Sequence, residues 1–194
     1  MTEADRIKWD KRYRAKSGEE MSPPSEFIQR WIDRCPRGRA LDVACGRGRN
    51  ALFLAASGYE VDAVDISEEA LRNARRTAQK SGLELNWILH DLDEPLCPDS
   101  PYDLIVMVHY VNLPLIALLT RLLKPGGILL CEQHLATGAE VAGPSNPAFR
   151  LKPQQMREAA RGLKILELKE CLLERDGELP LALIQLAATV NNNE

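Results

Sequence analysis

The middle of this chain alternates short, mostly apolar runs with amphipathic segments. The runs show no clean polar face, which predicts strands that are covered on both sides. The predicted strands are residues 40–44, 60–65, 85–89, 102–108 and 128–132. Between them apolar residues recur at helical spacing, and the predicted helices are residues 50–57, 68–80 and 113–123. Strands that alternate with helices favour a parallel sheet with helices on both faces.

The N-terminal segment precedes this alternation. Its pattern predicts a charged helix over residues 3–16, with Trp9 and Tyr13 four positions apart on one face. A second helix with an apolar stripe is predicted to begin at Ser25. We therefore expect residues 1–35 to form a helical cap outside the alternating unit.

The C-terminal segment also departs from the alternation. The further predicted elements are a turn at 124–127, a loop at 138–147, a helix at 153–161 and strands at 163–173 and 181–190. Asp176-Gly177 lies between the last two apolar runs, and this dipeptide is a strong signal for a hairpin. The expected topology is therefore five parallel strands followed by an antiparallel hairpin.

Composition excludes several classes of protein. The 194 residues are 45% apolar and 27% charged, which is typical of one globular domain. The net charge of -3 argues against a nucleic-acid partner. No apolar run approaches the roughly 20 residues of a membrane helix, and the charged start argues against a signal peptide. The five scattered cysteines include no Cys-x-x-Cys pair, so we expect no zinc site or disulfide and a cytoplasmic location.

A glycine-rich turn directly follows the first predicted strand. The segment Gly46-Arg47-Gly48-Arg49-Asn50-Ala51 matches G-x-G-x-x-G/A, which is typical of a turn that binds a nucleotide cofactor. Asp65 ends the second predicted strand, where a carboxylate can accept two ribose hydroxyls. Both NAD and S-adenosylmethionine (SAM) bring a ribose and a charged group to such a turn.

Acidic residues near the turn favour SAM over NAD. Asp42 lies inside the first predicted strand, where a carboxylate repels a pyrophosphate but complements the cationic amino-acid end of SAM. Arg47 and Arg49 favour phosphate unless they face solvent. Asp91 follows the third predicted strand and can accept from an adenine amino group. The three acidic positions together favour SAM.

The sequence resembles class I SAM-dependent methyltransferases over most of its length. The residues that carry the resemblance are Leu41 to Gly48, Asp65-Ile66-Ser67, Asp91-Leu92 and Leu123 to Gly127. The segments Gly48 to Ala51 and Trp9-x-x-x-Tyr13 are similar to the small-molecule branch that contains tellurite-resistance and thiopurine methyltransferases. The resemblance implies one methyltransferase domain over residues 1–194, with a Rossmann-like, doubly wound α/β sheet.

The resemblance also implies a role for each cofactor-binding position. The backbone at Ala44, Gly46 and Gly48 should line the methionine portion, although Ala44 stands where the family's turn has its first glycine. Asp65 should hold the ribose, and Ile66 should pack on the adenine. The complete predicted cofactor set is Trp9, Asp42, Ala44, Gly46, Gly48, Asp65, Ile66, Asp91, Leu92 and His109.

The three histidines share one kind of position. His90, His109 and His134 each lie at or just past the C-terminal end of a predicted strand, where open α/β sheets bind ligands. We expect no metal site, because the third, fourth and fifth strands are not mutually adjacent in the usual order. His109, Tyr110 and His134 are the candidate bases for an oxygen or nitrogen acceptor, whereas a thiolate or selenide needs none.

The methyl acceptor is expected to be a small molecule, with a soft thiol, selenium or tellurium nucleophile as one option. Residues 138–152 are the predicted substrate-side loop, and the predicted substrate contacts are Tyr13, Phe149 and Arg150. Residues 1–35 are the predicted lid. Two alternatives remain, a non-catalytic SAM-binding or partner-docking domain and an NAD(P)-dependent oxidoreductase. We expect a monomer or homodimer without nucleic-acid or membrane partners.

Overall fold

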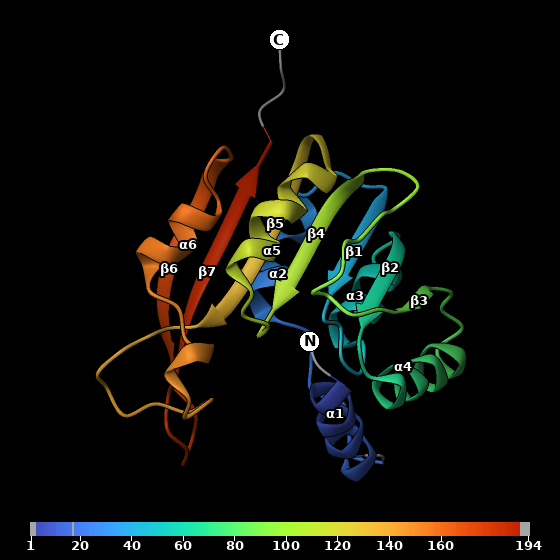
Figure 1. Cartoon of the computed structure of the whole chain (residues 1–194), viewed down its shortest axis with the longest axis horizontal. Coiled ribbons are helices and arrows are strands. Elements are labelled where there is room, and N and C mark those ends of the chain that lie inside the picture. The colour runs from blue at the N-terminus through green and yellow to red at the C-terminus, as the bar shows by residue number, and fades with distance from the viewer. Residues whose placement is uncertain (1–2, 17, 191–194) are drawn as a thin grey trace.

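The computed structural model of this chain describes residues 3–16 and 18–190. Its centre is a seven-stranded sheet in the order β3-β2-β1-β4-β5-β7-β6 (Figure 1). The strands are β1 (Arg39–Val43), β2 (Glu60–Asp65), β3 (Asn86–Leu89), β4 (Tyr102–Val108), β5 (Leu123–His134), β6 (Lys164–Leu173) and β7 (Leu181–Thr189). Strands β1 to β5 pair in parallel, and β7 pairs antiparallel with both β5 and β6. The predicted five parallel strands and hairpin are confirmed.

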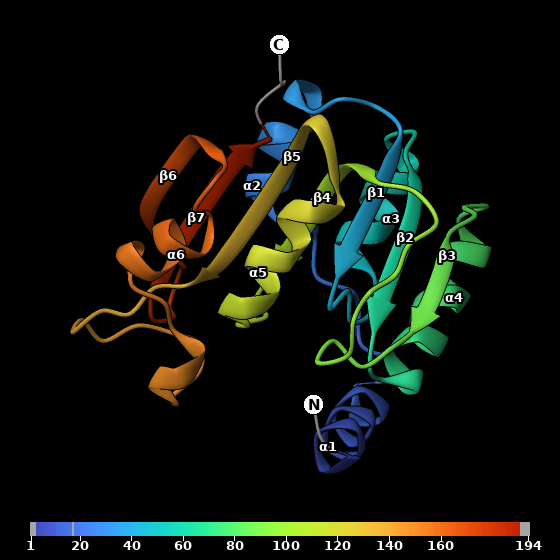
Figure 2. The same cartoon turned by 45° about the horizontal axis from the view of Figure 1, so that its top comes forward.

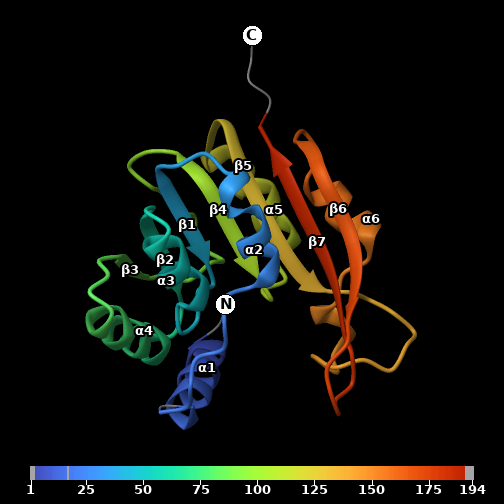
Figure 3. The same cartoon turned by 180° about the vertical axis from the view of Figure 1, so that it is seen from behind.

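Helices cover both faces of the sheet, as predicted. The helices are α1 (Glu3–Ala15), α2 (Glu26–Trp31), α3 (Arg49–Ala56), α4 (Glu68–Lys80), α5 (Leu113–Leu119) and α6 (Pro153–Ala159). Figures 1 and 3 show α2, α3 and α4 on one face and α5 and α6 on the other, each over its own buried core. Among the residues that the structure describes, no helix is long and apolar enough to cross a membrane.

The parallel strands end at one edge of the sheet, and this edge positions the functional residues. The carboxyl ends of β1, β2 and β4 point toward α1, which lies below the sheet in Figures 1 and 2. Strand β1 is central, because it pairs with β2 on one side and β4 on the other. Residues that follow β1, β2 and β4 are therefore brought together although they are far apart in the sequence.

Two serines precede helices and act differently. The Ser67 hydroxyl accepts the N–H of Ala70 at 3.1 Å, so Ser67 caps α4. Ser25 precedes α2 but makes no side-chain cap, because its hydroxyl donates to the buried carboxylate of Glu132 at 2.9 Å. The Ser25 side chain thus forms a polar contact between the start of α2 and β5 instead of a cap.

The prediction of a turn at residues 124–127 was wrong. These residues belong to β5, which begins at Leu123. The backbone follows an irregular path there, and the pairing register with β4 shifts between Tyr102 and Leu104. Gly127 is held by the end of β7, since its carbonyl accepts from the hydroxyl of Thr189 at 2.9 Å and from the N–H of the next residue, Val190, at 3.3 Å. Tertiary pairing therefore overrides the turn preference of the local Pro-Gly-Gly sequence.

Candidate functional site

The turn after β1 has a left-handed backbone at three alternate positions. The φ angle is 56° at Ala44, 55° at Gly46 and 81° at Gly48. Glycine adopts this conformation freely, whereas it costs about 1 kcal/mol or more in a residue with a Cβ, so Ala44 is strained. The N–H of Cys45 donates to the carbonyl of Val64 at 2.9 Å, which fixes the turn to β2. The sequence therefore builds a tight turn that depends on its two glycines.

Gly48 has no room for a side chain. A Cβ at this position would lie 2.8 Å from the ring of Trp87 and 3.1 Å from the Cβ of Ala74. These contacts are closer than van der Waals distance, so an added methyl group would push α4 or β3 away from the turn.

We expect Gly48→Ala to lower the free energy of unfolding by about 2 kcal/mol, because backbone strain and overpacking add. Gly82→Ala is the matched control, since Gly82 has a φ of 66° and nothing within 4 Å of a Cβ. The control should lose only about 1 kcal/mol in urea denaturation. Equal losses in the two variants would contradict the packing part of this explanation.

Asp65 connects the turn to the start of α4. Its Oδ2 accepts the N–H of Gly46 at 2.7 Å, and its Oδ1 accepts the N–H of Ser67 at 2.8 Å. Burial raises the pKa of Asp65, and the two N–H donors oppose that rise. Each carboxylate oxygen has a second lone pair, so this group can still accept hydroxyls of a ligand.

Asp42 is buried beside the turn with an unused oxygen. The residue is 1% exposed, and its Oδ2 has no hydrogen-bond partner within the described ranges. Burial raises its pKa to about 7, against the opposing effects of the Ala51 N–H and of Arg49. An orphaned buried carboxylate oxygen suits a ligand that brings a positive charge or an N–H group.

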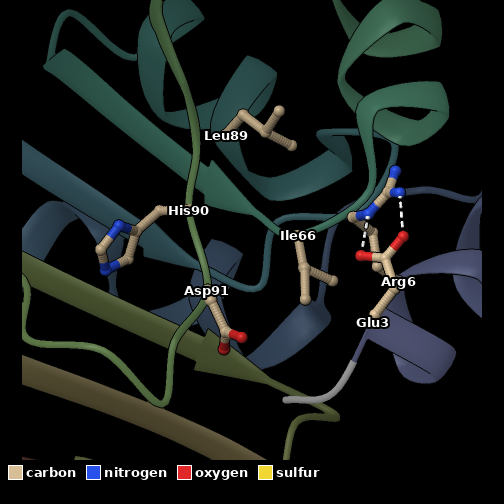
Figure 4. Close-up of a pocket in the computed structure, with 6 residues that line it drawn as sticks. All are labelled: Glu3, Arg6, Ile66, Leu89, His90 and Asp91. Atoms are coloured by element: carbon tan, nitrogen blue, oxygen red, sulfur yellow. Dashed lines mark hydrogen bonds and ion pairs between the residues drawn. The ribbon is translucent and has the colours of Figure 1, made fainter.

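A pocket of about 260 Å³ lies between α1 and the carboxyl ends of β2 and β3 (Figure 4). Its lining residues are Glu3, Arg6, Ile66, Leu89, His90 and Asp91. Ile66 and Asp91 are two of the predicted adenine contacts, and the structure brings them together. Leu92 is instead buried in the core on the α5 face.

Three lining residues, Glu3, Arg6 and Leu89, were not predicted, whereas His90 was predicted at the ligand-binding edge of the sheet but not as a cofactor contact. Leu89 and His90 directly precede Asp91, and this position was the available signal. Glu3 and Arg6 come from α1 and form an ion pair with each other (Figure 4). Nothing in the local sequence of α1 says which part of the sheet it contacts.

Helix α1 docks on the start of α4. Asp10 Oδ1 accepts the hydroxyl of Ser67 at 2.6 Å and the N–H of Glu69 at 3.2 Å. Arg14 forms an ion pair with Glu69 at 2.8 Å. These contacts place a carboxylate at the N-terminus of α4, where the helix dipole favours negative charge.

Tyr13 of α1 covers the glycine turn, and Trp9 supports it. The Tyr13 hydroxyl oxygen lies 2.7 Å from the position that a Cβ on Gly46 would take. Burial raises the pKa of Tyr13, which is therefore a neutral phenol at pH 7. Trp9 stacks on Tyr13 with 5.9 Å between the ring centroids. A ligand of the turn would meet Tyr13 directly.

Arg47 and Arg49 hold the segment after α1. The Arg47 guanidinium donates to the carbonyl of Glu19, and Arg49 donates to the carbonyl of Pro23 at 3.0 Å. Both arginines therefore bind backbone in this structure, and their presence in the turn does not require a phosphate ligand.

Two of the three histidines meet at the same edge of the sheet. The rings of His109 and His134 stack with 4.5 Å between centroids and 18° between planes. Burial lowers the pKa of His109 to about 3 and that of His134 to about 4, so both rings are neutral at pH 7. His90 lies apart, with its Nε2 at 3.2 Å from the carbonyl of Glu94.

The loop after β5 packs against His134. A Cβ on Gly143 would lie 2.7 Å from His134 Nδ1. Arg150 holds this loop, because its guanidinium donates to the carbonyls of Leu135, Ala142 and Pro144. Phe149 is 48% exposed, and Tyr110 packs partly buried against the core on the α5 face. The predicted substrate contacts Phe149 and Arg150 thus lie in one ordered loop beside a histidine.

The central part of the chain is similar to known proteins. Residues 40–127 match the family model described as a methyltransferase domain. The chain is 34% identical to the putative methyltransferase YqeM of Bacillus subtilis, over 57% of this chain and 49% of that protein. It is 26% identical to the probable S-adenosyl-L-methionine-dependent methyltransferase TehB of Haemophilus influenzae, over 68% of this chain and 48% of that protein. The chain spans about half the length of these curated relatives.

Solved structures share the fold. The crystal structure of TehB from Haemophilus influenzae aligns with a TM-score of 0.72 at 20% identity, covering 94% of this chain and 67% of that one. The magnesium protoporphyrin IX methyltransferase ChlM from Synechocystis, solved with bound SAH, aligns with a TM-score of 0.70 at 18% identity. That alignment covers 97% of this chain and 98% of ChlM. The turn, the carboxylates and the pocket therefore lie on a methyltransferase fold.

Proposed function

We propose that this chain, whose residues 40–127 match a methyltransferase domain, is a class I SAM-dependent methyltransferase that transfers a methyl group from SAM to a small-molecule acceptor. The observation that carries the proposal is the position of Asp65. Its carboxylate is tied to Gly46 of the left-handed turn, and the next residue, Ile66, lines the pocket with Asp91. One continuous edge thus offers a turn, an acceptor for hydroxyls and a pocket with an apolar wall at Ile66 and Leu89, which are three parts that SAM requires.

The residues present fit the parts of SAM. Asp42, with its orphaned oxygen, would accept from the amino group, and the backbone of the turn would line the methionine chain. Asp65 would hold the ribose hydroxyls. Ile66 and Asp91 would contact the adenine, with Leu92 supporting that loop from the core. Bound SAM supplies an activated methyl group, so the protein mainly contributes alignment and exclusion of water.

The acceptor would bind between the glycine turn and the loop after β5. His109 and His134 lie there as neutral imidazoles, and Tyr110 follows His109 in the chain. Phe149 and Arg150 belong to the loop that closes this side. A neutral site of this kind suits a small uncharged or soft acceptor, such as a thiol or a reduced selenium or tellurium compound. The net charge of -3 argues against a polynucleotide.

Isothermal calorimetry with SAM and with NADH tests the cofactor. We expect SAM to bind and NADH not to bind, because Asp42 would repel a pyrophosphate. Failure to bind SAM at millimolar concentration would overturn the proposal. A labelled-methyl assay over thiols, selenite, tellurite and phenols then identifies the acceptor. SAM binding without transfer to any acceptor would favour the non-catalytic alternative, and NADH binding would favour the oxidoreductase.

Helix α1 acts in this proposal as a lid on the cofactor. Tyr13 covers the turn, and Arg6 lines the pocket, so SAM can enter only when α1 moves away. The polar contact between Asp10 and the start of α4 would hold the closed position. Lids of this kind exclude water and slow the release of ligand.

We expect Asp10→Ala to raise the dissociation rate of SAM about tenfold, because a charge-assisted contact of the closed lid is lost. Stopped-flow fluorescence of Trp9 on α1 can follow the release. Lys11→Ala is the matched control, since Lys11 is exposed on the same helix. The same dissociation rate in both variants would contradict the lid.

A further inference from the structure

Glu132 is a buried carboxylate near the C-terminal end of β5, and neither the motifs nor the proposed function uses it. It is 4% exposed. Ser25 Oγ donates to its Oε1 at 2.9 Å, and Gln185 Nε2 donates to its Oε2 at 2.7 Å. Both donors are neutral, so they orient the carboxylate without balancing its charge. Burying a charge in this way is costly, which indicates a purpose beyond packing.

The imidazole of His109 lies beside this carboxylate. His109 Nε2 is 4.0 Å from Glu132 Oε1, and the His109 N–H donates to the Glu132 carbonyl at 2.9 Å. His109 has a φ of 57°, an uncommon conformation for a residue with a side chain. The stack on His134 fixes the plane of the ring. Backbone and ring contacts thus hold the Nε2 edge of His109 toward the buried carboxylate.

His109 also reaches the open side of the site. Its side chain is 31% exposed, whereas that of Glu132 is 5% exposed. The imidazole therefore stands between a buried carboxylate and the region where the acceptor is proposed to bind. With Nε2 toward Glu132, Nδ1 is the nitrogen left for another partner.

The orientation of Gln185 is fixed by a further contact. Arg30 donates to Gln185 Oε1 at 3.1 Å, and it pairs with Glu167 at 2.6 Å. Because the amide oxygen of Gln185 accepts from Arg30, its NH₂ group must face Glu132. Residues from α2, β6 and β7 thus cooperate to keep the oxygens of Glu132 as acceptors.

We propose that Glu132 is a positioning residue, whose carboxylate, 4.0 Å from Nε2, favours the Nε2–H tautomer of His109 electrostatically and leaves Nδ1 free to take a proton from the methyl acceptor. The inference rests on the proposed function and narrows its substrate class. The acceptor's lone pair forms the bond to the methyl carbon, while the carbon–sulfur bond breaks and its electron pair stays on sulfur. The acceptor's proton passes to Nδ1 of His109, and the Glu132 carboxylate stabilises the imidazolium against the burial that lowers the pKa of this ring. No group is oxidised or reduced.

A general base is needed only by acceptors whose nucleophilic atom carries a proton at neutral pH. A phenol or an ordinary alkyl thiol must lose its proton during transfer, so it gains from a base. A nucleophile that is already anionic in solution gains nothing from it. The structure therefore favours a protic hydroxyl or thiol as the physiological acceptor.

The tautomer of His109 gives a test that does not depend on turnover. Long-range ¹H–¹⁵N spectra of the full chain, labelled at histidine, distinguish the two tautomers at pH 7.5, and a His109→Gln variant assigns the signals. We expect wild-type His109 to be protonated at Nε2. In Glu132→Gln, the NH₂ group of Gln185 still points at residue 132, so the amide oxygen of the introduced glutamine must face Gln185. The NH₂ group of the introduced glutamine then faces Nε2 of His109. The tautomer should then invert to Nδ1–H.

Transfer activity gives the second test. Glu132→Gln should lower kcat about 100-fold with 4-methoxyphenol, and it should change kcat less than about threefold with 4-nitrothiophenol, which is ionised at neutral pH. Glu132→Asp, which keeps the charge, should recover part of the loss. Glu170→Gln is the matched control, because it removes an exposed carboxylate of β6 that takes no part in these contacts, and it should leave kcat with both acceptors unchanged.

The outcomes separate this inference from the proposed function. An unchanged His109 tautomer in a folded Glu132→Gln variant would overturn the role of Glu132. Equal losses with both acceptors, together with weaker SAM binding, would also overturn it, because they indicate a structural role. If neither acceptor is methylated, the tautomer measurement alone decides whether Glu132 positions His109. A wild-type protein that fails to bind SAM would instead contradict the proposed function.

Discussion

Asp65→Ala is expected to weaken SAM binding about 100-fold, which is the largest loss that we predict for one side chain at the cofactor site. Two ribose hydroxyls would lose a charged acceptor, and two such hydrogen bonds at the low end of their usual strength contribute about 3 kcal/mol together. The substitution also leaves the N–H groups of Gly46 and Ser67 without their acceptor. Calorimetry with SAH measures the affinity without turnover, and we expect it to fall while the protein stays folded.

Asp62 is the matched control for this experiment, since it lies three residues earlier in β2. Its carboxylate accepts from Arg39, Asn86 and Tyr102 at 2.7–2.8 Å. Asp62→Ala should therefore lower the free energy of unfolding by about 3 kcal/mol but leave the SAH affinity of the folded protein unchanged. If both variants lose affinity equally, Asp65 acts through the stability of β2 and not through contact with the cofactor.

Much of the fold follows from short-range patterns. Strands β2 and β4 begin and end at the predicted residues, because each apolar run is bounded by polar and turn-forming residues. The hairpin of β6 and β7 was also predicted, since Asp176-Gly177 separates its strands. The start of β5 was not, because the pairing of Gly127 with β7 is a contact between residues about 60 positions apart.

The site was predictable where topology alone brings residues together. His109 and His134 follow neighbouring parallel strands, so their rings were expected at the same edge, and they stack there. The N-terminal helix was predicted as a lid, but the positions of Glu3 and Arg6 in the pocket were not, because the polar face of α1 gives no unique docking position. Glu132 was also missed, since it reads as the polar end of an apolar run and its partners come from α2 and β7.

Asp42→Asn is expected to stabilise the protein at high pH and to weaken its binding of SAM. Burial raises the pKa of Asp42 to about 7, above its value of about 4 in the unfolded chain. The unfolded chain therefore releases this proton first as pH rises, and the folded state loses stability between pH 4 and pH 7. The loss reaches about 4 kcal/mol above pH 7, because each pKa unit corresponds to about 1.4 kcal/mol.

Denaturation at pH 5 and pH 8 measures this effect. The amide that replaces the Asp42 carboxyl cannot ionise, so the gain of the variant over wild type should grow by about 3 kcal/mol from pH 5 to pH 8. Asp65 also has a raised pKa, but it is present in both proteins and cancels in the comparison. A gain that does not depend on pH would mean that Asp42 is already ionised in the folded protein at pH 5.

The same carboxylate links SAM binding to proton release. The positive amino group of SAM would favour ionised Asp42, so binding should tighten as pH rises from 6 to 8 and should release a proton near pH 7. Calorimetry in two buffers of different ionisation enthalpy counts that proton. Asp42→Asn should release none and should bind SAM about tenfold more weakly at pH 8. Retained proton release in the variant would assign the titrating group elsewhere and leave the orphaned oxygen of Asp42 without a role in binding. The stability that Asp42 costs at neutral pH is thus expected to be recovered when its charge meets the cofactor.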